Sequence, residues 1–154
     1  MLRTVIALAS ILISLPLLAR EHSHVAHLDG GEEVPPNASL ATGFAVLTLE
    51  QGATNIRISY RYEGIASGVT GGHIHGPAAA GANAGILFNL APPADTAAQV
   101  LDLSFPIDAA QLQDLRDGLW YVNLHSTSFP GGEIRGQLDI IFEDGLDIEP
   151  TPGL

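Results

Sequence analysis

The sequence predicts one all-β domain, built as a sandwich or a barrel. Its 17 glycines and 10 prolines separate short runs rich in valine, isoleucine, leucine, tyrosine and phenylalanine, which is the pattern of such folds. In the run 55–63, Ile56, Ile58, Tyr60 and Tyr62 share one face, and polar residues take the other. A strand with this alternation is buried on one side only, as in an antiparallel sheet.

Strands are expected over residues 25–29, 43–50, 55–63, 71–75, 85–90, 99–105, 119–125 and 134–142. One segment departs from this pattern. Asp108 and Gln111 have the spacing of a capping box, and the apolar periodicity that follows ends at Gly118. We expect a short crossover helix of two to three turns between two strands.

The first residues indicate export. Arg3 provides a positive charge before the apolar run 5–19, which is too short for a spanning helix and is followed at once by Arg20 and Glu21. We expect 1–19 to be a signal peptide cut after Ala19, which gives a periplasmic or extracellular protein. An uncleaved membrane anchor is the alternative.

The remaining chain divides into a histidine-containing leader (20–26), one domain (27–142) and an acidic tail with two prolines (143–154) that we expect to be disordered. The whole sequence has no cysteine and no lysine, and its 17 acidic residues stand against six arginines, five of which follow residue 19. Nucleic acid and anionic membrane surfaces need cationic partners, so both are excluded as ligands.

His73 and His75 are two residues apart in an expected strand, so both side chains point to one face. In another strand, Tyr121, Asn123 and His125 share a face by the same parity. If the two strands are neighbours, His73, His75 and His125 converge into a three-nitrogen site for copper or zinc. The alternative is a set of hydrogen-bonded histidines on a polar sheet face.

Five motifs occur in order at residues 33–36, 41–43, 73–78, 121–126 and 130–136. Together they resemble the CHRD domain, named from chordin and common as a single exported domain in bacteria. The resemblance covers about residues 27–142 and implies an immunoglobulin-like, Greek-key antiparallel β-sandwich.

Residues 71–75 also resemble, more faintly, the copper-binding strand of copper/zinc superoxide dismutases, which are themselves Greek-key sandwiches. The chain departs from that family because it has no disulfide and no convincing bridging histidine or zinc loop. The resemblance favours copper over zinc, and analogy of fold alone does not supply the activity.

Cleavage after Ala19 would create a second copper site. Its ligands would be the amine of Arg20, the amides of Glu21 and His22, and the His22 ring, which together form a square plane. A hydrophilic leader that happens to contain histidine is the alternative.

Near the other end of the chain, Glu133 could orient a ligand imidazole, or Arg135 could guide an anion to the metal. The two residues could equally form an ion pair at the end of a sheet.

We therefore expect an exported protein that binds one transition metal, copper or zinc, through His73, His75 and His125. One rival is a metal-free binding or structural module of the cell envelope. Another is a copper redox enzyme, of superoxide dismutase type, acting on a small oxygen species. No catalytic residue stands out in the sequence.

Overall fold

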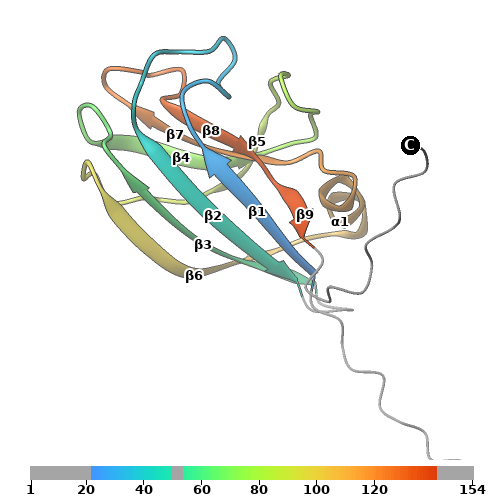
Figure 1. The fold of residues 1–154 in the computed structure, drawn as a ribbon. Helices are drawn as coiled ribbons and strands as arrows, with labels where there is room; N and C mark the ends of the chain where they lie inside the picture. The colour runs from blue at the N-terminus through green and yellow to red at the C-terminus, as the bar shows by residue number, and fades with distance from the viewer. Residues whose placement is uncertain (1–21, 50–53, 142–154) are drawn as a thin grey trace, which may run out of the picture.

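The computed structural model describes residues 22–49 and 54–141 as a sandwich of two antiparallel sheets (Figure 1). The larger sheet has five strands in the order β6-β3-β2-β1-β9. Their bounds are His22–Leu28 (β1), Thr42–Leu49 (β2), Asn55–Glu63 (β3), Ala98–Pro106 (β6) and Asp139–Ile141 (β9).

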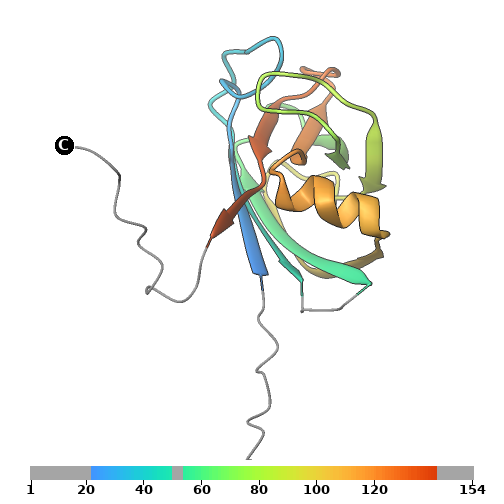
Figure 2. The same ribbon diagram turned by 90° about the vertical axis from the view of Figure 1, so that its right-hand side faces the viewer.

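The smaller sheet has four strands in the order β5-β4-β7-β8. Their bounds are Val69–His75 (β4), Ile86–Asn89 (β5), Tyr121–Ser126 (β7) and Ile134–Gln137 (β8). Helix α1, Ala109–Arg116, connects β6 of one sheet to β7 of the other and lies against one side of the sandwich (Figure 2). The antiparallel sandwich with a crossover helix is therefore confirmed.

The capping box predicted for the helix is present. The Gln111 amide donates to Asp108 Oδ1 at 2.8 Å, and the Asp108 amide donates to Gln111 Oε1 at 3.0 Å. Just beyond the helix, Gly118 has a φ of +68°, a conformation that favours glycine. Leu115 is fully buried and fixes the helix to the core.

The core lies between the sheets and follows the predicted alternation. In β3, Ile56, Ile58, Tyr60 and Tyr62 are buried, and the residues between them face outward. The two tyrosine hydroxyls donate to the carbonyl oxygens of Leu90 and Pro93, which connects this sheet to the chain that follows β5. The largest buried side chain is that of Trp120.

The last expected strand, 134–142, is wrong as a single element. It consists of two strands, because β8 pairs with β7 and β9 pairs with β1 of the other sheet. Between them Leu138 is fully buried, and its amide donates to the Trp120 carbonyl at 2.9 Å. Burial of Leu138 at the crossing between the sheets interrupts the alternation that a single strand would show. Phe142 lies outside the described residues.

The first strand begins earlier than the sequence indicated. β1 starts at His22, so 22–26, which was assigned to the leader, belongs to a strand that pairs with β2. The expected signal peptide (1–19) and acidic tail (143–154) lie outside the described residues. Within the part that is described, no helix is long and apolar enough to span a bilayer.

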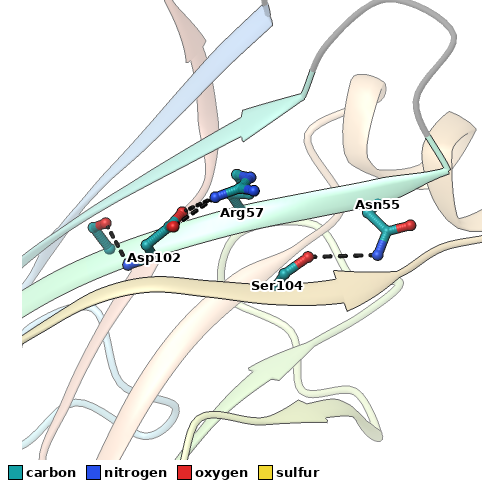
Figure 3. A network of polar contacts seen from close by, with 5 residues as sticks. Asn55, Arg57, Asp102 and Ser104 are labelled. Carbon is teal, nitrogen blue, oxygen red and sulfur yellow. Dashed lines mark hydrogen bonds and ion pairs between the residues drawn. The ribbon is translucent and has the colours of Figure 1, made fainter.

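The edge strand β6 carries a bulge opposite β3. Asp102 has a φ of +59°, and its amide donates to Ser59 Oγ at 3.0 Å. Its carboxylate contacts the Arg57 guanidinium at 2.5 Å (Figure 3), and both side chains are well exposed. An exposed ion pair of this kind contributes at most about 1 kcal/mol to stability. The bulge interrupts the flat edge along which another chain might otherwise pair.

Candidate metal centre

Three histidines lie together on the outer face of the four-stranded sheet. His73 and His75 come from β4, and His125 comes from the neighbouring strand β7. Residues of opposite parity, such as Ile74 and Leu124, are fully buried in the core, which leaves the histidines on the outer face. One ring nitrogen from each histidine lies within 4.8 Å of the others. These are the three histidines that the sequence predicted to converge if their two strands were neighbours.

Gly71 makes room for the rings. It is the cross-strand partner of His125, and a Cβ atom there would lie 3.4 Å from His73 Cε1 and 3.9 Å from His125 Cδ2. A larger side chain at this position would fill the space beside both imidazoles. Gly71, two residues before His73, therefore keeps two of the three rings accessible.

The distances between the three imidazole rings are close to those of a metal site, but they are not yet short enough for all three nitrogens to bind one ion. His73 Nδ1 and His125 Nε2 are 3.1 Å apart, and the His73 and His75 ring centroids are 5.4 Å apart. Two nitrogens bound to one ion at about 2.0–2.1 Å lie no more than about 4.2 Å apart. The most distant nitrogens therefore have to approach one another by side-chain rotation before all three can bind.

Backbone carbonyls orient two of the rings. His75 Nδ1 lies 3.0 Å from the Ala84 oxygen, and His125 Nδ1 lies 3.1 Å from the Pro130 oxygen. A carbonyl accepts only, so each of these Nδ1 atoms carries the proton, and the neutral ring has its lone pair on Nε2. A metal-ligating histidine usually donates a hydrogen bond from its other ring nitrogen to such an acceptor.

Burial favours the neutral form of the two more open rings. It lowers the pKa of His73, and repulsion from His125 and His75 lowers it further. Burial also lowers the pKa of His125, while the hydrogen bond to Pro130 acts in the opposite direction. Since only a neutral imidazole binds a metal, both effects leave lone pairs available near neutral pH.

An open cleft leads to His73 and His125 but not to His75. Its other lining residues are small or polar: Thr70, Gly71, Asn89, Ala91, Pro92 and Pro130. His75 is only 8% exposed and lies deeper. Solvent therefore reaches two of the three histidines directly.

A buried polar array surrounds His75, and the sequence did not reveal it. The Tyr121 ring stacks on the His75 imidazole, and the Arg135 guanidinium lies 3.4 Å from the centre of the Tyr121 ring. His75 Nε2 lies 3.1 Å from Asn123 Oδ1. Buried Glu33 interacts with Asn123 and Arg135. Strand parity placed Tyr121 and Asn123 on the histidine face, but nothing local indicated that Glu33 would reach them.

Glu133 and Arg135 do not pair with each other. Glu133 Oε1 accepts hydrogen bonds from the Ser39 hydroxyl and the Ala66 amide, away from the three rings. Arg135 is 1% exposed and donates to Asn83 Oδ1 and the Ala82 carbonyl. It thereby holds the loop whose Ala84 carbonyl orients His75.

The amino-terminal site cannot be assembled from the described residues, because Arg20 and Glu21 lie outside them. The backbone of His22 is in β1, where it pairs with Leu49. The site remains a prediction.

A separate hollow lies on the five-stranded sheet. It is lined by residues of β1, β2 and β3 that include His27, Phe44 and Arg61, and it shares no residue with the histidine cleft. No second group of three metal-ligating side chains occurs among residues 22–49 and 54–141.

The architecture and the site define a small antiparallel β-sandwich with a histidine cluster on the outer face of one sheet. The CHRD domain family matches residues 24–138, and the chain belongs to this family. No curated protein and no solved structure matches the chain.

Proposed function

We propose that this CHRD-domain protein binds one transition metal through His73, His75 and His125. The observation that carries the proposal is the grouping of three imidazole nitrogens within 4.8 Å on adjacent strands. The carbonyl partners of His75 and His125 add to it, because they select the tautomer that presents Nε2 as a ligand.

The donor set suits copper and zinc. Imidazole nitrogen is a good ligand for both ions, and the sequence contains no cysteine that would add a soft thiolate. Copper binds more tightly than zinc at a given nitrogen site, so copper is the first choice where both are present. A three-histidine site also leaves a coordination position for water or a small ligand.

Export is part of the same proposal. The support for it is the positive charge of Arg3, the apolar run 5–19, and Arg20 and Glu21, which follow that run at once. An exported, acidic protein would meet metal ions outside the cytoplasm.

The structure removes one support for a dismutase-like activity. The sequence offered Arg135 as a possible guide for an anion, but Arg135 is buried over the Tyr121 ring. None of the residues that line the cleft is an arginine. Metal binding is therefore the better proposal, and an envelope module that binds no metal is the rival.

The test is metal-dependent stabilisation of the purified protein. A metal that binds only the folded state at a hundredfold excess over its Kd stabilises that state by about 2.7 kcal/mol. Copper(II) or zinc(II) should raise the Tm at pH 7.5, and the gain should shrink toward pH 5 as protons compete for the imidazoles.

Replacing His73, His75 or His125 by alanine should each remove most of this gain. His27→Ala is the matched control, because His27 is an exposed histidine on the other sheet. If all four variants show the metal-dependent shift of the parent, the site does not exist and the envelope-module interpretation replaces it.

A further inference from the structure

His75 differs from the other two histidines because both of its ring nitrogens already have partners. Nδ1 lies 3.0 Å from the Ala84 carbonyl, and Nε2 lies 3.1 Å from Asn123 Oδ1. The ring is held flat against Tyr121, with centroids 4.8 Å apart. The His75 ring is therefore fixed in position, but Nε2, the nitrogen that would bind a metal, is in contact with Asn123.

Asn123 and a metal cannot share that nitrogen. An ion at about 2.0–2.1 Å from Nε2, along the lone pair, would lie only about 1 Å from the present position of Asn123 Oδ1. Because Nδ1 of His75 carries the proton, Nε2 can only accept, so the amide holds the ring with its NH2 group, which exchanges places with Oδ1 by a half-turn of the amide. Either amide atom at this position conflicts with the ion. The Asn123 side chain must therefore leave before His75 can bind an ion.

The other two histidines are not blocked by a third side chain. His73 Nδ1 donates to His125 Nε2, and this proton moves to His73 Nε2 or to solvent when an ion binds. His73 Nδ1 and His125 Nε2 are 3.1 Å apart, and two ligands of one tetrahedral ion are about 3.3 Å apart. Both line the open cleft, and the contact that a metal would replace is one between the two ligands themselves. An arriving ion therefore meets this pair first.

Asn123 has an alternative partner when it releases His75. It is 4% exposed on β7, between His73 of β4 and Arg135 of β8 in the sheet register. The Glu33 carboxyl already interacts with it, and Glu33 Oε1 is buried without a hydrogen-bond partner. The displaced amide can therefore turn toward Glu33 without losing every polar contact.

We infer that Asn123 is a lock on the third ligand: it holds His75 in the metal-free protein and is displaced when a metal bound by His73 and His125 recruits His75. This inference rests on the proposed function. It makes Asn123 a positioning residue that sets the affinity and rate of metal binding without being a ligand.

The experiment is a zinc(II) titration by calorimetry, with stopped-flow measurement of the association rate. Asn123→Ala removes the competing group, so zinc should bind about five- to tenfold more tightly than in the parent, the equivalent of one hydrogen bond. His75→Ala should weaken binding. The ¹⁵N chemical shift of His75 Nε2 should change in metal-free Asn123→Ala. If Asn123 acted only on the structure elsewhere, this shift would stay as in the parent.

Asn55→Ala is the matched control. Asn55 lies at the start of β3 in the other sheet, outside the histidine cleft, and its amide donates to Ser104 Oγ at 3.4 Å. Its zinc affinity should equal that of the parent. If Asn123→Ala folds poorly, Asn123→Ser keeps a polar side chain that is too short to reach Nε2.

Two outcomes overturn the lock while leaving the site intact. In one, both Asn123 variants bind zinc as weakly as His75→Ala, which means that Asn123 orients His75 instead of blocking it. In the other, the Asn123 variants match the parent while His73→Ala and His125→Ala still weaken binding. If no histidine variant affects zinc binding, the proposed function itself fails.

Discussion

The phenol ring of Tyr121 lies flat against the imidazole of His75, with ring centroids 4.8 Å apart and planes inclined by 2°. The Arg135 guanidinium lies over the same tyrosine ring, 3.4 Å from its centre. A cation and an imidazole thus share one aromatic ring in the interior of a small domain. This arrangement fixes the plane of the deepest histidine of the cluster.

Removing the Tyr121 ring should weaken metal binding. Tyr121→Leu keeps apolar bulk but loses the flat surface on which His75 rests, and we expect zinc affinity to fall about tenfold, as when other groups that orient a ligand are lost. Tyr121→Phe is the control, because it keeps the ring and loses only the hydroxyl that accepts the Ala84 amide. Equal affinity in the parent and Tyr121→Leu, measured by calorimetry, would show that the stack does not orient His75.

Glu33 should make the protein less stable as pH rises. Burial raises the pKa of Glu33 from 4.5 to about 7, and Arg135 only partly opposes the change. Between pH 4.5 and about pH 7 the folded state binds more protons than the unfolded state. The free energy of unfolding therefore falls as the pH increases through this range. Glu33→Gln should remove this fall, as measured by urea denaturation from pH 4.5 to 8.

The control for Glu33 is Glu32→Gln, because Glu32 is the exposed neighbour. Its pH profile should follow that of the parent. If the free energy of unfolding of Glu33→Gln changed with pH as it does in the parent, the pKa of Glu33 in the folded protein would be the ordinary one.

Glu133 should matter for stability and not for metal. Its Oε1 accepts from the Ser39 hydroxyl at 2.8 Å and from the Ala66 amide at 2.9 Å. Glu133→Ala leaves both donors without this acceptor, and we expect a loss of about 2–4 kcal/mol in the free energy of unfolding. Zinc affinity measured well below the Tm should stay within twofold of the parent, and a larger change would restore the idea that Glu133 orients a ligand.

Gly136 should not tolerate a side chain. A Cβ atom at this position would overlap the His27 carbonyl oxygen, where β8 passes β1. Since the obstacle is backbone, it cannot rotate away, and Gly136→Ala should cost about 3 kcal/mol or more of stability. Gly131→Ala is the control, because nothing lies within 4 Å of the added atom. Similar melting temperatures for the two variants would contradict the close crossing of the strands.

Strand parity explains why part of the site was predictable. His73 and His75 had to share a face wherever β4 lay, and Tyr121, Asn123 and His125 had to share one in β7. The position of Asn123 against His75 was not predictable, because it depends on a register of pairing between strands almost fifty residues apart.

The buried charges were unpredictable for a related reason. Charged side chains are rarely buried, so the residue types of Glu33 and Arg135 gave no indication of burial. They are buried because the loop before β2 and the loop after β4 close over the outer face of the smaller sheet. Arg135 holds the second of these loops through Asn83 and Ala82.

By itself, the sequence determined the class of fold, the short helix with its capping box, and the faces on which the histidines lie. These features depend on the backbone geometry of a few consecutive residues, and so they are local. Only the tertiary structure decided that β4 and β7 are neighbours, that the last expected strand divides between two sheets, and that Asn123 occupies the nitrogen of His75. Those outcomes depend on how distant segments compete to bury Leu138, Trp120 and the rest of the core, and no local pattern encodes the result of that competition.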